Sequence, residues 1–127
     1  MLSHWPALLL VALGGALGGA LRYGVSGWVA RRVGETFPWG TLVVNTSGAF
    51  VLGLLMGAAG GLPVAQRELW LLFCVGVLGS YTTVSSLSLQ ALLLARDGQR
   101  GRAWGYVGLS LAAGAAAVVG GWWLLAP

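Results

Sequence analysis

The sequence is poor in charge and in reactive side chains. It contains no lysine, one histidine, one cysteine and three carboxylates, and charged residues make up 8% of its 127 residues, against about 25% in a typical soluble domain. A single cysteine excludes an intrachain disulfide and a cysteine-based metal cage, so we interpret Cys74 as a small apolar filler. The only histidine is His4, and hydroxyls without a general base in reach are inert. The composition therefore argues against an enzyme.

All the basic charge comes from arginine. Seven arginines and three acidic residues give a net charge of +4. Proteins that bind nucleic acid gather basic side chains on one solvated face, whereas most of these arginines occupy short connections between apolar runs. We therefore expect no nucleic-acid partner.

Long apolar runs account for most of the chain. Hydrophobic residues make up 57% of the sequence, and the mean hydropathy is +0.84. A membrane-spanning helix needs about 20 predominantly apolar residues, and four stretches meet this need: 5–30, 39–60, 68–95 and 103–125. The first run lacks the charged leader of a signal peptide and is too long for one. The sequence predicts one all-α domain over residues 1–127 that crosses the lipid bilayer four times.

Tryptophan and glycine support this arrangement. All seven tryptophans fall within a few positions of a predicted span end, as expected for side chains at headgroup depth; stacking on a sugar or a nucleobase is the competing interpretation. Several of the 22 glycines repeat every four residues, which lets helix backbones approach closely in lipid. The repeats are Gly14/Gly18, Gly15/Gly19, Gly53/Gly57 and Gly101/Gly105.

A polar interruption divides the third apolar stretch. Residues 76–90 carry six serine and threonine hydroxyls, on Ser80, Thr82, Thr83, Ser85, Ser86 and Ser88. Within lipid, a break rich in glycine and hydroxyls is tolerated only where protein or a wet cavity surrounds it. The sequence therefore predicts that the third helix is broken at its middle and that the break belongs to a site.

Other polar residues lie inside the predicted spans. Arg22 either snorkels to the interface or raises the local anion concentration at a pore mouth. Asn45 needs partners in lipid, and it forms an interhelical hydrogen bond, fixes the broken helix or donates to a dehydrated anion. Tyr106 and Ser110 are four residues apart and share a helix face, and with Thr41 they could form a polar strip.

No Asp, Glu, Lys or His falls near the middle of any predicted span. Proton-coupled transporters and cation carriers generally use a carboxylate at that depth, which disfavours a small multidrug-type exporter as the alternative. Passive anion conduction and a non-conducting assembly or packing subunit both remain open. Because four helices fill their own centre with side chains, a pathway across the bilayer implies an oligomer, most simply a dimer.

Three motifs, in order along the chain, resemble those of the Fluc/CrcB family of fluoride channels. Arg22-Tyr23 after a glycine-rich helix resembles the end of the family's first-helix motif. Residues 40–50, GTLVVNTSGAF, resemble its second-helix signature G-T-L-x-V-N-x-x-G-x-F, and residues 76–83, GVLGSYTT, resemble its third-helix G-x-x-G-x-x-T-T. The four-span plan covers the whole chain.

The resemblance implies a passive, fluoride-selective channel of the bacterial cytoplasmic membrane through which cells shed fluoride. It implies an antiparallel, dual-topology dimer with a sodium ion at its centre, held by the backbone carbonyls of Gly79 and Thr82 from each subunit. The anion pathway implied by the resemblance and by the hydroxyl run comprises Arg22, Thr41, Asn45, Thr83, Val84, Ser85, Ser86, Leu87, Tyr106 and Ser110.

The sequence departs from this family at the pore. Val84 and Leu87 occupy the positions of two phenylalanines whose electropositive ring edges face fluoride in relatives, and Gln90 stands where an acid is frequent. The first and third connections also hold five arginines, against Arg67 alone in the second. The positive-inside rule then predicts a fixed orientation with the first and third connections in the cytoplasm. Both departures favour an oppositely oriented paralogue as the second subunit; the alternative is a homodimer whose pore is built from Tyr81, Phe50 and hydroxyls.

Overall fold

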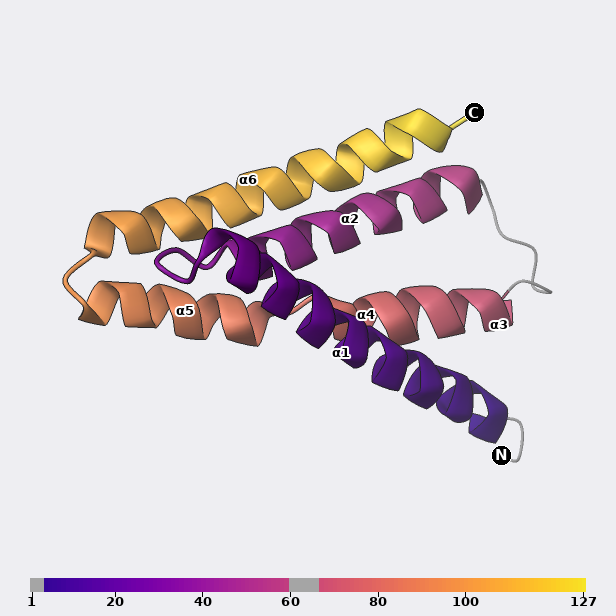
Figure 1. The fold of residues 1–127 in the computed structure, drawn as a ribbon. Coiled ribbons are helices and arrows are strands. Elements are labelled where there is room, and N and C mark those ends of the chain that lie inside the picture. Colours follow the sequence, from indigo (N-terminus) through magenta and orange to yellow (C-terminus); the bar gives the residue numbers. More distant parts are fainter. Residues whose placement is uncertain (1–3, 60–66) are drawn as a thin grey trace.

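The computed structural model describes residues 4–59 and 67–127, and the regular structure in these ranges is helical throughout. Four apolar helical spans lie along the molecule (Figure 1). The first is α1 (Trp5–Val33), the second α2 (Trp39–Ala59) and the fourth α6 (Arg100–Leu125); the third comprises α3 (Arg67–Trp70), η3 (Leu71–Leu78), α4 (Gly79–Tyr81) and α5 (Val84–Arg96). The prediction of an all-α, four-span protein with a broken third helix is confirmed.

The helices extend further into the arginine-rich connections than expected. Helix α1 continues through Arg31 and Arg32 to Val33, and Gly34, with a φ of 88°, ends it by donating its N–H to the Ala30 carbonyl. Between α5 and α6 only residues 97–99 remain outside a helix. Arginines in a last helical turn are favourable because the carbonyl end of a helix carries negative partial charge. The loops predicted at 31–38 and 96–102 are therefore shorter than expected, while residues 60–66, which include the predicted end of the second span, lie outside the described ranges.

Glycines bring α1 into direct contact with the third span. Gly14 and Gly18 are buried, and a Cβ on either would overlap a backbone carbonyl oxygen of η3. Gly76 faces them from η3, where an added Cβ would lie 2.9 Å from the Gly14 Cα. Gly15 has open space around it, and Gly19 meets only a side-chain oxygen at 3.4 Å. The close approach predicted for the Gly14/Gly18 repeat is confirmed, and that predicted for Gly15/Gly19 is not made within the described chain.

A second glycine contact joins α2 to α6, which run side by side (Figure 1). Gly53 and Gly57 on α2 and Gly121 on α6 each lie so close to the facing backbone that a Cβ would clash with it. Gly101 and Gly105 have no heavy atom within 4 Å of an added Cβ, so this repeat meets no neighbour within the described chain. The α5 segment packs against α6, whereas η3 packs against α1.

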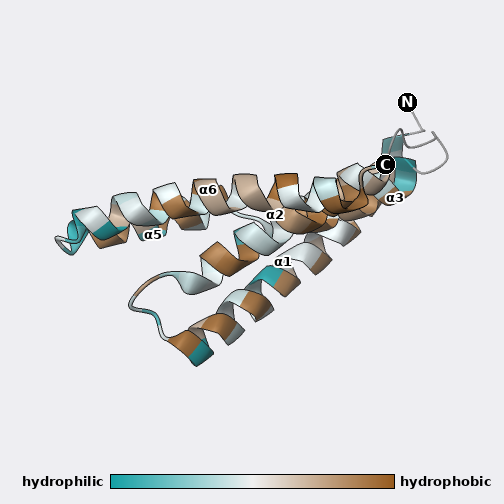
Figure 2. Cartoon of the chain, turned by 90° about the horizontal axis from the view of Figure 1, so that it is seen from above, coloured by the Kyte–Doolittle hydropathy of each residue, from teal (hydrophilic) through white to brown (hydrophobic). Residues whose placement is uncertain are grey.

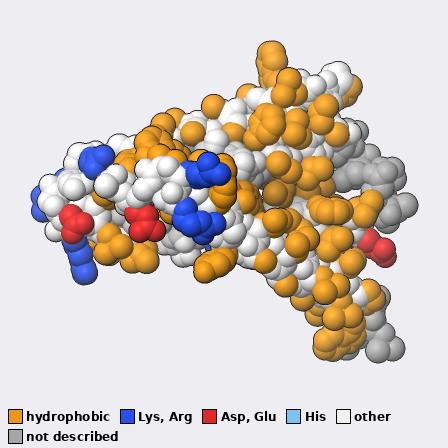
Figure 3. Space-filling model, in the orientation of Figure 1, with side chains coloured by type: hydrophobic (Ala, Val, Ile, Leu, Met, Phe, Trp, Pro, Cys, Tyr) orange, Lys and Arg blue, Asp and Glu red, His pale blue; other side chains and the backbone are white. Residues whose placement is uncertain are grey.

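The outside of the bundle is apolar along most of its length. Tryptophans near span ends, such as Trp5, Trp104 and Trp123, and leucines such as Leu13 are exposed. The most hydrophilic residues lie mainly near the helix ends (Figure 2), and arginines and carboxylates gather at the end where α5 joins α6 (Figure 3). A soluble monomer rarely exposes so large an apolar surface. The chain is therefore a multi-pass protein whose surroundings are lipid.

Candidate functional site

The third span is interrupted at two residues. Thr82 has a ψ of 154°, and Thr83 has φ and ψ of −150° and 123°, so both are extended. Helix α5 begins directly after them, and the Thr83 Oγ1 caps it by accepting the Ser86 N–H at 3.2 Å. The break expected over residues 76–90 is thus confined to Thr82 and Thr83, because the hydroxyl-rich segment after it is helical.

Asn45 of α2 holds the break from the side. The Thr83 N–H donates to Asn45 Oδ1 at 2.7 Å, and Asn45 Nδ2 donates to the Thr83 carbonyl at 2.9 Å. Ser47 and Tyr81 add a hydroxyl–hydroxyl bond of 2.9 Å between the same two spans. The geometry therefore matches two of the expectations for Asn45, an interhelical bond and a support for the broken helix. One Nδ2 hydrogen of Asn45 remains beyond the bond to Thr83.

The break removes the helical hydrogen-bond donors of two carbonyls. In a continuous α-helix the N–H of Thr83 would reach the Gly79 carbonyl, and the N–H of Ser86 would reach the Thr82 carbonyl. Here these two N–H groups donate to Asn45 Oδ1 and to Thr83 Oγ1. Gly79 is also exposed. The backbone oxygens of Gly79 and Thr82 have thus lost their helical partners, at the place where the family resemblance implies ion ligands.

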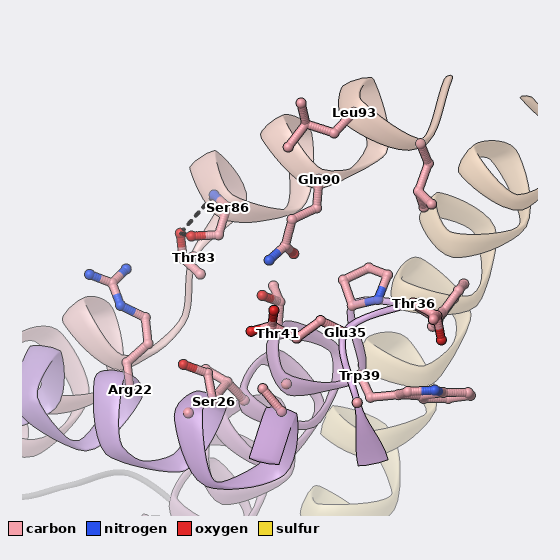
Figure 4. A pocket seen from close by; sticks show the side chains of 18 of the residues that line it. Arg22, Ser26, Glu35, Thr36, Trp39, Thr41, Thr83, Ser86, Gln90 and Leu93 are labelled. Carbon is pink, nitrogen blue, oxygen red and sulfur yellow. Dashed lines mark hydrogen bonds between the residues drawn. The ribbon is translucent and has the colours of Figure 1, made fainter. Parts of the chain in front are cut away.

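A half-open cavity of about 800 Å³ leads from the arginine-rich end of the molecule to this break. The second half of α1, the connection 34–38, the start of α2, and α5 form its walls. Four of the predicted site residues line it, namely Arg22, Thr41, Thr83 and Ser86 (Figure 4). These side chains supply a guanidinium and hydroxyls, which are groups that can donate hydrogen bonds to an anion.

Gln90 also lines the cavity, although it is not among the predicted site residues. Its side chain extends toward Thr41 across the cavity (Figure 4). The hydroxyl of Tyr106, a fully buried residue, donates to Gln90 Oε1 at 3.0 Å, which leaves the amide Nε2 as the donor end. The spacing of the sequence could have identified Gln90 as a lining residue, since Ser86 and Gln90 are four residues apart and share one face of α5.

The remaining predicted site residues do not line the cavity. Ser110 is buried on α6, and its hydroxyl has no hydrogen-bond partner in the described chain. Ser85 and Val84 lie on the outer surface of α5, where Val84 is 75% exposed. Leu87 packs instead against the internal apolar cluster that contains Leu42. Val84 and Leu87, the two positions where the resemblance implies phenylalanines, therefore face different surroundings.

Comparison with known proteins gives consistent matches. A family model described as CrcB-like protein, Camphor Resistance (CrcB), matches residues 9–122. The chain is 53% identical to the fluoride-specific ion channel FluC 2 of Rhodopseudomonas palustris (strain BisB18) over 106 residues, which cover 82% of this chain and 81% of that protein. It is 48% identical to FluC 2 of Bradyrhizobium diazoefficiens, over 87% of this chain and 82% of that one.

A relative from a thermophile fits the same pattern. The fluoride-specific ion channel FluC of Thermus thermophilus (strain ATCC BAA-163) is 50% identical over 100 residues, or 75% of this chain and 74% of that protein. The family model covers all four spans and the break between them. With identities near one half over most of its length, this chain belongs to the CrcB family.

Proposed function

We propose that this chain conducts fluoride passively across the cytoplasmic membrane and thereby lets the cell shed it. The single observation that carries this proposal is family membership with relatives named as fluoride-specific channels. The geometry supports it, because the cavity presents Arg22, Thr41 and Ser86 to an entering ion and ends at the broken third span. In this proposal the Gln90 amide Nε2 and the hydroxyls of Thr41 and Ser86 replace part of the hydration shell of the anion.

Passive conduction is favoured because the spans carry no proton relay. No Asp, Glu, Lys or His occurs within residues 5–30, 39–60, 69–95 or 103–125, and the two carboxylates that line the cavity, Glu35 and Asp97, belong to the connections. A multidrug-type exporter would require an intramembrane acid. Family membership likewise places the chain among channels rather than enzymes.

The functional unit in this proposal is an antiparallel dimer. The outer surface of the third span exposes Gly79, Val84, Ser85 and Ser88 near the middle of the membrane. Hydroxyl groups and a freed backbone carbonyl are unfavourable against lipid, so a second subunit is needed to cover this surface. Packing two such surfaces together would place the two breaks next to each other.

A sodium ion at the centre of that dimer is part of the proposal. Among the described residues no group of three or more His, Cys, Asp or Glu side chains is placed to hold a metal, so backbone oxygens are the available ligands. The carbonyls of Gly79 and Thr82 fit this role, since both lack their helical donors and carbonyl oxygens suit a hard alkali cation. When bound, the ion would offset the repulsion between carbonyl dipoles gathered from two subunits.

Removing sodium should therefore weaken the dimer. We expect the purified protein to unfold at a lower temperature, and to shift toward monomer on gel filtration, when sodium is replaced by the bulky cation N-methyl-D-glucamine. Sodium present at a hundred times its dissociation constant would stabilise the folded state by about 2.7 kcal/mol. Unfolding curves and elution volumes that do not change between the two cations would contradict the sodium site.

A pairing of two different chains is the second candidate. Five arginines lie in or beside the two connections on one side of the membrane and Arg67 alone on the other, which favours one orientation. Val84 and Leu87 also lack the aromatic ring edges that the family resemblance implies at these two positions. An oppositely oriented paralogue could supply both the antiparallel partner and the missing rings.

One experiment tests the function and separates these two assemblies. The chain alone is reconstituted into liposomes loaded with potassium fluoride or potassium chloride, and ion efflux is followed with ion-selective electrodes. We expect fluoride efflux with chloride retained. Efflux that appears only when a second CrcB-family chain is added would support the paired assembly, and equal release of both anions would exclude a fluoride-selective channel.

A further inference from the structure

Arg102 is held in one place at the open end of the cavity. It lies in the first turn of α6 and lines the cavity. Its guanidinium carbon is 5.8 Å from the centre of the Phe37 ring, and its Nη1 donates to Gln99 Oε1 at 3.3 Å. A guanidinium over an aromatic face is attracted by the negative charge of the ring face. The side chain therefore makes two contacts, one with a residue of each connection.

The ring beneath Arg102 is itself fixed. Phe37 meets Tyr106 edge to face, with ring centroids 5.4 Å apart and planes at 88°, and it packs on Trp39 at 4.7 Å. Tyr106 in turn is fully buried and bonded to Gln90. A continuous chain of contacts thus runs from the guanidinium of Arg102, through the rings of Phe37 and Tyr106, to the side-chain amide of Gln90.

The charge of Arg102 is not neutralised by a direct partner. In the described part of the chain no ion pair is found for Arg102, and the side-chain hydrogen bond that it forms is to the neutral Gln99. The charged residues that line the cavity are two arginines, Arg22 and Arg102, and two carboxylates, Glu35 and Asp97. Their formal charges cancel. Loss of Arg102 alone would leave the cavity with a net charge of −1.

We infer that Arg102 concentrates anions at the cavity mouth and so sets the rate at which they enter. This inference rests on the proposed function. In it, Arg102 acts through the electrostatic field of its positive charge and does not bind the ion inside the membrane. Charges on a low-dielectric entrance raise the local concentration of the opposite charge and the entry rate. The effect is screened by salt, because the Debye length falls from about 30 Å at 0.01 M to about 3 Å at 1 M.

The test compares Arg102→Gln with Arg100→Gln in liposomes at low and high ionic strength. Arg100 is two residues away on the same helix but lines a separate apolar groove between α5 and α6. We expect Arg102→Gln to lower fluoride efflux about twofold to fivefold at low ionic strength, as a unit charge some 5–10 Å away predicts, and to match the wild type at high ionic strength. Arg100→Gln should lower efflux less than Arg102→Gln at low ionic strength, because its charge lies outside the cavity, and should match the wild type at high ionic strength.

Two further variants separate a field effect from a structural one. Arg102→Lys keeps the charge but loses the planar stack, so it should restore efflux to within twofold of the wild type at low ionic strength. Glu35→Gln removes a negative charge at the mouth and should raise efflux at low ionic strength by a similar factor. Equal efflux of Arg102→Gln and wild type at low ionic strength, or a loss that persists at high ionic strength, would overturn the inference. A wild type without fluoride efflux would contradict the proposed function instead.

Discussion

Asn45→Asp is expected to reduce fluoride efflux at least a hundredfold. The substitution keeps the shape of the side chain but replaces the Nδ2 donor with an oxygen, which then faces the Thr83 carbonyl that Nδ2 now bonds at 2.9 Å. Two oxygens without a proton between them repel each other, and each buried polar group left without its bond costs about 1–3 kcal/mol. The extended pair Thr82–Thr83 would lose its lateral support, and the cavity would gain a negative charge near its inner end.

The measurement is fluoride efflux from liposomes, with gel filtration to show that the variant is folded. The matched control is Thr46→Val, the adjacent residue on α2, because the Thr46 hydroxyl is buried and has no hydrogen-bond partner in the described chain. That isosteric change should leave efflux within about twofold of the wild type, since no hydrogen bond is lost. Efflux that persisted in a double variant, Asn45→Ala with Tyr106→Phe, would contradict the proposed pathway.

Gly18→Ala is expected to prevent formation of a stable protein. A Cβ at this position would overlap the carbonyl group of Val77 in η3, and a backbone carbonyl in a packed helix cannot move aside as a side chain does. Overpacking a well-filled contact costs about 1–3 kcal/mol or more, a large share of the total stability of a small domain. We expect a low yield of monodisperse protein and a markedly lower unfolding temperature in detergent.

The control for this prediction lies three residues earlier on the same helix. Gly15 has no heavy atom within 4 Å of an added Cβ, so Gly15→Ala adds the same methyl group without a clash. By helix propensity alone this control should be stabilised by about 0.5–1 kcal/mol. Similar unfolding temperatures for the Gly15→Ala and Gly18→Ala variants would show that the contact between α1 and η3 is looser than the structure indicates.

Features with a strong compositional signal were predictable from the sequence. Apolar length predicted the four spans, and four-residue glycine spacing predicted close helix contacts, which Gly14 makes with η3 and Gly53 makes with α6. Spacing could not distinguish these repeats from Gly101/Gly105, which faces open space. That distinction depends on which face of each helix meets a neighbour, and hydrophobicity says little about this in a chain that is apolar all round.

The extent of the break was not predictable, because serine and threonine hydroxyls can be accommodated within a helix as well as in a break. What separates Thr83 from Ser85 and Ser88 is a partner 38 residues away, Asn45, which takes the Thr83 N–H. The contact of Arg102 with Phe37 was not predictable for the same reason, since it joins α6 to the connection 34–38, which is far from it in the sequence. Contacts of this kind arise from the tertiary arrangement and leave no local pattern.

The break also lies between two pairs of closely packed helices. On one side α1 and η3 interlock through Gly14, Gly18 and Gly76, and on the other α2 and α6 interlock and carry α5. A change in bilayer thickness tilts helices at modest energetic cost. If such a tilt moves α1 and η3 relative to α2 and α6, the chain can adjust at Thr82 and Thr83, the two extended residues that lie between α4 and α5.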